Sequence, residues 1–329
     1  MFGRGKKAAP ESAGRTATPH RRPERHVSKR LVGLDFGAHS LKLSEVEHGP
    51  LGPVVRTFGI APYQTDRNGH ADLVKTLDGL VRSSRVSSAD AVLTIPETDA
   101  CMIATGHPAD HVRSKLDSRL SSVAVCWPVG DRLLAVPRWV YDFYDDVVRM
   151  AGLKLSGVQH TSSALGRSVA DLGRTVVLDL GAESTGWYVF DHGSLVQRAS
   201  VPYGGEALTQ ALAMAYGWTR EHAEEHKRSL QGDPQSWPDE TQLVTDAFLK
   251  RLWDDLHKHL AEQPAHLQNV VLVGGGSRFT PVREFVFSRL GLLPQDWQLP
   301  VSAHVSEPLR PHLEPHVVLL ANSLSHLVY

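Results

Sequence analysis

The chain has 329 residues, of which 41% are hydrophobic and 22% charged, and its formal net charge is −1. The length allows two modest domains with a substantial core, and the overall charge gives no attraction to a polyanion. No apolar run approaches the roughly 20 residues that span a bilayer, and no motif surrounds either of the two cysteines. We therefore expect a cytosolic globular protein without a disulfide framework.

Positive charge is concentrated at the N-terminus. Residues 1–30 carry nine Lys or Arg against two Glu, a net +7, so the remainder carries −8. Because this stretch has almost no large apolar residues, we predict a disordered basic tail. Such a tail can contact anionic lipid or nucleic acid, or it can be solvated without a partner, and composition alone does not separate these interpretations.

The first chemically informative stretch is residues 31–45, LVGLDFGAHSLKLSE. An apolar strand enters a turn at Asp35 and Gly37, and a second strand follows, so we predict a β-hairpin whose turn amides converge on an anion. We expect Gly37 to take backbone angles that other residues avoid. Asp35 is too negative to contact phosphate and would hold Mg²⁺ through water. Ser40 offers a hydroxyl, and Lys42 a cation, just past the turn.

Strand and helix then alternate, which predicts an α/β domain. Period-2 and period-3.6 patterns place strands at 54–61, 91–95, 123–127 and 132–135, and helices at 71–81, 111–120, 139–151 and 159–171. Helix 159–171 is expected to lead into the second half.

Residues 175–188, TVVLDLGAESTGWY, repeat the hairpin pattern, with Asp179 at 144 positions after Asp35. Gly181 and Thr185 take the places of the turn glycine and the hydroxyl. One D-x-G turn is weak evidence, because most hairpins bind nothing. Two matched copies indicate a duplicated α/β half with a cleft between the copies.

Downstream, Gly204 and Gly205 precede an Ala-rich helix at 206–216, and Thr219 is expected to cap a further helix that carries Glu224 and Lys227 on one face.

A long helix is predicted at 240–263 and a strand at 270–273. After Gly274, Gly275, Gly276 and Ser277 comes a helix with Thr280 as its cap, Pro281 at its first position and Gly291 past its end. The apolar end, 316–329, predicts a helix packed on the body, or alternatively one lying on a membrane.

Each of these features also has an ordinary interpretation. Three glycines alone are a tight connection, and Glu224 with Lys227 alone is a surface ion pair. Residues 222–226, HAEEH, match H-x-x-E-H, in which His222 and His226 would share zinc and Glu225 would act as base. Since the chain has 18 His, chance pairs are expected, and zinc remains an alternative that metal analysis would test.

The order of motifs resembles a known superfamily. Two D-x-G hairpins followed by NVVLVGGGS at 269–277 look like the actin-like ATPases, and VGLDFGAHSLKLSEVE, VLTIPET and VVLVGGGSRFTPVREFVFSRLGL resemble the PilM family of type IV pilus assembly proteins. The resemblance implies a duplicated actin-like (ribonuclease H-like) α/β fold with two domains around a nucleotide cleft. It places domain I at 31–170, with an inserted subdomain at about 62–136, and domain II at 171–329, with an adenine-side subdomain at about 206–268.

The resemblance also implies cofactors and partners. ATP would bind with Mg²⁺, its phosphates at the two turns and Lys42, and its adenosine at Gly274, Gly275, Gly276, Ser277, Glu224 and Lys227; Gly205 would also be a cofactor-binding residue. The chain would be a cytoplasmic, peripheral component at the inner membrane of a bacterium. It would grip the N-terminal cytoplasmic tail of a PilN-like membrane protein, beside the inserted subdomain, and would meet other pilus assembly proteins. No nucleic acid partner is expected.

Two other classes remain open. A small-molecule kinase needs a carboxylate near the end of the first half, but residues 157–166, GVQHTSSALG, contain no Asp or Glu. Gln159 or His160 would at most orient water for slow hydrolysis. A filament-forming actin relative is the other alternative, and polymer formation with ATP would favour it.

Overall fold

The computed structural model describes residues 30–63, 69–96, 99–104, 124–129, 132–230, 236–259, 266–296 and 304–305. In this part of the chain, strands and helices alternate as in an α/β protein, which confirms the predicted fold class. The predictions for the basic segment 1–29, for helix 111–120 and for the C-terminal helix 316–329 lie outside the described residues.

The first large sheet has the strand order β14-β3-β2-β1-β4-β8. Its centre is the predicted hairpin, in which β1 pairs antiparallel with β2, while the parallel strands β4 and β8 continue the sheet on the other side of β1. The bounds are β1 Arg30–Phe36, β2 Ser40–Gly49, β3 Gly52–Pro62, β4 Asp90–Ile95, β8 Lys154–His160 and β14 His304–Val305.

The second large sheet has the order β11-β10-β9-β12-β13. Here β9 and β10 form the second hairpin, β11 extends it, and β12 and β13 run parallel to β9. The bounds are β9 Arg174–Leu180, β10 Thr185–Asp191, β11 Ser194–Val201, β12 Asn269–Val273 and β13 Pro294–Asp296.

The two sheets repeat one plan. Strands β3-β2-β1-β4-β8 correspond to β11-β10-β9-β12-β13, with the same succession of antiparallel and parallel pairs. Asp35 and Asp179 consequently occupy equivalent positions near the carboxyl ends of the central strands β1 and β9. The duplication inferred from two short motifs is thus confirmed by strands on both sides of each hairpin.

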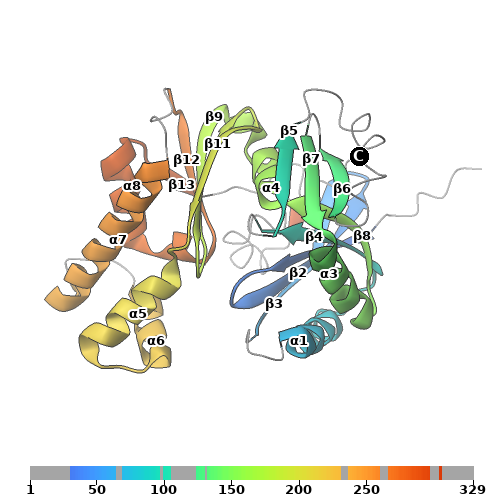
Figure 1. Ribbon diagram of the computed structural model, residues 1–329, viewed down its shortest axis with the longest axis horizontal. Helices are drawn as coiled ribbons and strands as arrows, with labels where there is room; N and C mark the ends of the chain where they lie inside the picture. The colour runs from blue at the N-terminus through green and yellow to red at the C-terminus, as the bar shows by residue number, and fades with distance from the viewer. Residues whose placement is uncertain are drawn as a thin grey trace, which may run out of the picture.

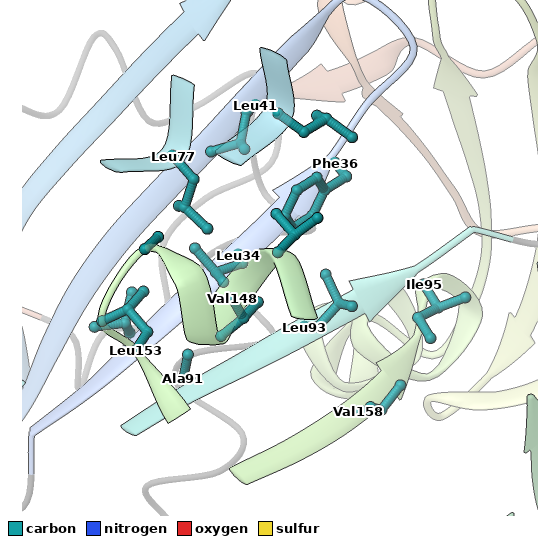
Figure 2. Close-up of a cluster of buried hydrophobic side chains, with 14 of the residues drawn as sticks. Leu34, Phe36, Leu41, Leu77, Ala91, Leu93, Ile95, Val148, Leu153 and Val158 are labelled. Carbon is teal, nitrogen blue, oxygen red and sulfur yellow. The ribbon is translucent and has the colours of Figure 1, made fainter. Parts of the chain in front are cut away.

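Helices cover the outer faces of the two sheets, as Figure 1 shows. On the six-stranded sheet, α1 (Gly69–Ser83) and α3 (Arg138–Met150) pack over a core of Leu and Val side chains that includes Leu34, Leu93 and Val148 (Figure 2). The other sheet packs against α5 (Gly205–Tyr216), α7 (Asp239–His259) and α8 (Thr280–Leu290), with α6 (Arg220–Ser229) beside α5.

A third cluster lies between the two sheets. Helix α4 (Thr161–Ser168) contributes to it and contacts strands of both sheets, β8 and β4 on one side and β11 on the other. We call it the intersheet cluster; its buried members are Leu31, Val46, Val55, Val92, Leu165, Val169, Val177, Tyr188, Phe190, Val271 and Val273. The inner faces of the sheets are therefore joined by a continuous apolar core.

A small three-stranded sheet, in the order β5-β7-β6, occupies the position of the predicted insertion. Its strands are β5 (Cys101–Ala104), β6 (Ala124–Val129) and β7 (Arg132–Pro137). The sequence predicted β6 and β7 but not β5. From β7, the Arg132 guanidinium donates a hydrogen bond to the Leu195 carbonyl on β11 at 3.1 Å, so the small sheet contacts the second half directly.

Two local predictions are wrong. Residues 154–160 form strand β8, so Gln159 and His160 end a strand and do not begin a helix. This strand is short and only its last three residues are buried, which hides its period from a pattern search. At α8 the N-cap is Phe279, without a side-chain cap, and Thr280 and Pro281 are already helical. The predicted Thr219 cap is confirmed, because its hydroxyl accepts from the His222 amide.

Helix ends at two glycines agree with the sequence. Gly217 after α5 and Gly291 after α8 both adopt the left-handed conformation that suits glycine at this position. Among the helices of the described part of the chain, none is long and apolar enough to cross a membrane.

Candidate functional site

The two hairpin turns have matching hydrogen bonds. The Gly37 amide donates to the Ser40 carbonyl, and the Gly181 amide donates to the Ser184 carbonyl, each at 3.0 Å. Neither Gly37 nor Gly181 has a positive φ, so the expectation of unusual backbone angles is wrong. The reason for glycine is space: an added Cβ would lie 3.2 Å from the Ser40 oxygen or 2.8 Å from the Ser184 oxygen.

The matched turns also correct the choice of hydroxyl. Ser184, five residues after Asp179, occupies the position that Ser40 has after Asp35, a spacing that the sequence already contains. Thr185 is fully buried, pairs with Leu180, and donates its hydroxyl to the Tyr203 carbonyl at 2.8 Å. Thr185 therefore stabilises the hairpin, while the exposed Ser184 is the hydroxyl at the turn.

Asp35, Lys42 and Asp179 form the electrostatic centre of the site. Lys42 and Asp35 face each other across β1 and β2, and their Nζ and Oδ2 atoms lie 2.6 Å apart. Burial raises the pKa of Asp179 to about 6; the Lys42 cation opposes this shift and the Asp35 carboxylate adds to it. A half-buried Asp179 carboxylate is thus not fully compensated by the one lysine.

Replacing Lys42 by Met is expected to raise the pKa of Asp179 further, because the opposing cation is lost. The partly buried Asp35 also loses its partner, so the free energy of unfolding should fall by about 1–3 kcal/mol at pH 8. At pH 5, where Asp179 binds a proton, the loss should be smaller. Denaturant unfolding at both pH values tests this, with the exposed Lys75→Met as control; an equal loss at both would contradict it.

A row of polar residues lies near the carboxyl ends of β1, β4 and β8 in the first sheet. Asp35 pairs with Thr94 of β4, and Thr94 pairs with Gln159 of β8, so the three share the sheet face that carries the intersheet cluster. Gln159 is 3% exposed. His160 points to the opposite face, is fully buried, and contacts the Ser162 hydroxyl at 2.7 Å; its burial lowers its pKa to about 4. Of the two residues proposed to orient water, only Gln159 faces the site.

Tyr63 follows the last residue of β3 and contacts the first turn. Its hydroxyl donates to the Gly37 carbonyl. Burial raises the pKa of Tyr63 to about 12, and the carboxylates of Asp35, Glu183 and Asp99 contribute. Glu183 belongs to the second turn, so the two hairpin turns are near enough to affect each other electrostatically. No sequence pattern indicates Tyr63, because a lone Tyr after a strand has no recognisable spacing.

The first turn also contacts the start of α5 across the two halves. His39 Nε2 lies 3.6 Å from Glu206 Oε2, and Glu206 accepts two hydrogen bonds from Arg220, at 2.6 and 2.7 Å. The second turn is joined to the same helix start: the Gly205 amide donates to the Gly181 carbonyl at 3.0 Å. Both turns therefore contact the N-terminus of α5.

Glu224 and Lys227 form a network with α5. The Lys227 ammonium lies 2.5 Å from Glu224 and donates to Thr209 at 2.7 Å and to the Gly205 carbonyl at 3.1 Å. Thr209 also donates to Glu224 at 2.6 Å. Burial pushes the pKa of Glu224 upward, but hydrogen bonds from Lys227 and Thr209 outweigh it and leave the pKa lowered. The pair is half-buried and hydrogen-bonded to the Gly205 carbonyl, so it is not a surface ion pair alone.

The glycines after β12 differ in what they contact. An added Cβ on Gly274 would lie 2.6 Å from both Asp179 Oδ1 and the Leu180 carbonyl, and one on Gly276 would lie 2.9 Å from the Leu180 Cβ. Around Gly275 no atom of the described residues lies within 4 Å of that position. Ser277 donates its hydroxyl to the Gly274 carbonyl at 2.8 Å. Only Gly275 therefore offers bare backbone to a ligand, while Gly274 and Gly276 let strands β12 and β9 approach.

The zinc alternative finds no support in the geometry. His222 and His226 both pack on Trp218, with ring centroids 4.6 and 4.9 Å away, and Trp218 stacks on Tyr216 at 4.2 Å. Among the residues that the structure describes, no group of three or more His, Cys, Asp or Glu is placed to hold a metal ion. The HAEEH motif is part of an aromatic cluster at the turn between α5 and α6.

Comparison with known proteins agrees with this fold. Residues 156–296 match the family model of the type IV pilus assembly protein PilM. The solved PilM-PilN type IV pilus biogenesis complex contains a chain with 18% identity and a TM-score of 0.72, covering 90% of this chain and 98% of that one. The chain has a PilM-type actin-like fold. None of the curated proteins compared matches it.

Other solved structures share the fold at greater distance. The ethanolamine utilization protein EutJ from Carboxydothermus hydrogenoformans has 18% identity and a TM-score of 0.58, covering 90% of this chain and 89% of that chain. MreB5 of Spiroplasma citri, bound to AMPPNP, has 11% identity and a TM-score of 0.56, covering 89% and 94%. The likeness to EutJ and MreB5 extends the actin-like fold beyond the PilM-type chain.

Proposed function

We propose that the chain is a cytoplasmic, ATP-binding, actin-like component of a type IV pilus or related assembly machine, peripheral at the inner membrane. The observation that carries the nucleotide part is the placement of Asp35 and Asp179 at equivalent strand ends of a duplicated sheet, with Lys42 paired to Asp35 and near enough to lower the pKa of Asp179. In this proposal residues 31–170 and 171–329 are the two domains that flank the nucleotide.

The residues present suit a magnesium–nucleotide complex. Mg²⁺ prefers few carboxylates and keeps several waters, and Asp35 with Asp179 provides two carboxylates at matched positions. Burial raises the pKa of Asp179 more than the Lys42 cation lowers it, so a divalent cation would stabilise this buried carboxylate and would also neutralise the phosphates. Lys42 and the two turns would hold the phosphates, while Gly275, Glu224 and Lys227 would line the adenosine side.

The partner we propose is the N-terminal cytoplasmic tail of a PilN-like inner-membrane protein. Support comes from the PilM family match over 156–296 and from the fold shared with a PilM chain solved in complex with PilN. The small sheet β5-β7-β6 is the insertion beside which we place the tail. Its contact from Arg132 to the Leu195 carbonyl gives a direct connection between that region and the second half.

The second candidate is an actin-fold nucleotide hydrolase or small-molecule kinase. The observation that favours hydrolysis is Gln159, which lies in register with Thr94 and Asp35 on the same sheet face. An amide can orient water but cannot take a proton as a carboxylate does, so turnover would be slow and transfer to a sugar hydroxyl disfavoured.

Calorimetric titration of the full chain with ATP, with and without Mg²⁺, tests the nucleotide part, and phosphate release is followed in the same samples. Magnesium-dependent binding with little release is expected. Rapid release would favour the hydrolase, and absence of binding would leave a fold that acts through protein contacts alone. A peptide of the PilN-like tail, titrated separately, should bind at micromolar concentrations; a scrambled peptide of equal charge is the control.

A further inference from the structure

Thr94 lies at the centre of the polar row, within the stretch VLTIPET, and the sequence alone assigned it no role. It sits on β4 between Asp35 of β1 and Gln159 of β8, in register with both. Two residues before it, Val92 belongs to the intersheet cluster together with Val177, and Asp179 follows Val177 by two positions on β9. Alternation along each strand therefore turns Thr94 toward the side of the site where Asp179 lies.

The Thr94 hydroxyl is buried without a partner. The residue is 2% exposed, and within the described ranges its Oγ1 atom accepts and donates no hydrogen bond. Two other buried threonines are satisfied: Thr161 donates to the Ile95 carbonyl at 3.2 Å, and Thr185 donates to the Tyr203 carbonyl at 2.8 Å. Because an unsatisfied buried hydroxyl is costly and valine fills the same volume, a hydroxyl at this position points to a ligand.

We infer that Thr94 binds the hydration shell of the magnesium ion that accompanies the nucleotide, accepting a hydrogen bond from a metal-bound water. This inference rests on the proposed nucleotide function. Mg²⁺ dehydrates reluctantly and its waters are donors, whereas carboxylates and a threonine oxygen are acceptors. Thr94 would thus complete, with Asp35 and Asp179, a set of oxygen acceptors contributed by β1, β4 and β9.

The test compares Thr94→Val, which removes only the hydroxyl, with Thr94→Ser, which keeps it. Nucleotide-free Thr94→Val should unfold at the same temperature as the wild type or higher, since a buried unsatisfied group is removed. The Mg²⁺ concentration that gives half-maximal ATP binding should rise about tenfold. ATP affinity in EDTA should stay unchanged, and Thr94→Ser should behave as the wild type.

Three results would overturn the assignment. If the wild type binds Mg-ATP and Thr94→Val has the same Mg²⁺ dependence, Thr94 plays no part in the metal shell, although the proposed function stands. If the nucleotide-free variant is less stable, the hydroxyl is satisfied within the free protein. If the wild type shows no Mg²⁺-dependent ATP binding at all, the proposed function fails first and the hydroxyl holds at most an ordinary water.

Discussion

Asp179→Asn is expected to remove Mg-ATP binding and, at the same time, to stabilise the nucleotide-free protein above pH 6. Burial raises the pKa of Asp179 from its ordinary value of 3.8 to about 6. The folded state therefore binds the Asp179 proton more tightly than the unfolded chain does. The stability that this proton provides is complete below about pH 4 and is lost as the pH rises through 6.

At pH 7 to 8 the wild type holds the poorly solvated carboxylate, whereas an asparagine has no charge to bury. A shift of about two pKa units corresponds to roughly 3 kcal/mol. Because Asp179 keeps partial exposure, we expect a gain in the free energy of unfolding of about 1–2 kcal/mol at pH 8 and little at pH 4. ATP affinity in the presence of Mg²⁺ should fall at least about 100-fold, since one of two metal-facing carboxylates is gone.

Denaturant unfolding across pH 4 to 8, combined with ATP titration, measures both effects. Asp191→Asn is the matched control: Asp191 ends the next strand of the same hairpin and is exposed, so neither stability nor binding should change. A variant that binds Mg-ATP as the wild type does would remove Asp179 from the site. A variant less stable at pH 8 would show that the carboxylate is satisfied in the free protein.

The sequence carried enough information for the hairpins and the duplication, because each depends on local patterns. Apolar runs, a Gly turn and the spacing from Asp35 to Asp179 are all visible in the letters, and strand pairing adds only the register. What it could not supply are contacts across the sheet. Thr94 meets Asp35 only because β4 lies beside β1, and Tyr63 reaches Gly37 only through the end of β3.

The direction of side chains was the other property that could not be predicted from the sequence. The assignment of Thr185 to the turn failed because a shift of one residue along a strand moves a side chain to the opposite face. The same rule separates Gln159, which faces the site, from His160, which faces the core of the first half. Residue type predicted the chemistry at these positions, but only the pairing register decided which of two neighbours can take part.

Gly274→Ala and Gly275→Ala should separate packing from ligand binding in the glycine run. Gly274 has φ 82 and ψ 170, a conformation that is essentially restricted to glycine, and a Cβ there would press on Asp179 and on the Leu180 carbonyl. We expect Gly274→Ala to lower the free energy of unfolding by about 2–5 kcal/mol. Gly275→Ala meets no described atom within 4 Å, so stability should change by less than about 0.5 kcal/mol.

Gly275→Ala, which should leave stability nearly unchanged, is expected to weaken ligand binding. If adenine lies against its bare backbone, Gly275→Ala should weaken ATP binding about tenfold while leaving the affinity for inorganic triphosphate with Mg²⁺ unchanged, because triphosphate has no base to displace. Calorimetry of the wild type and of Gly275→Ala with each ligand gives the four affinities needed, and thermal unfolding gives the stability of both proteins. Equal loss for ATP and triphosphate would mean that the methyl group disturbs the phosphate side through Gly274 and Asp179. No loss for ATP in a stable variant would move the adenine away from this turn and leave the glycines as a close contact between β12 and β9.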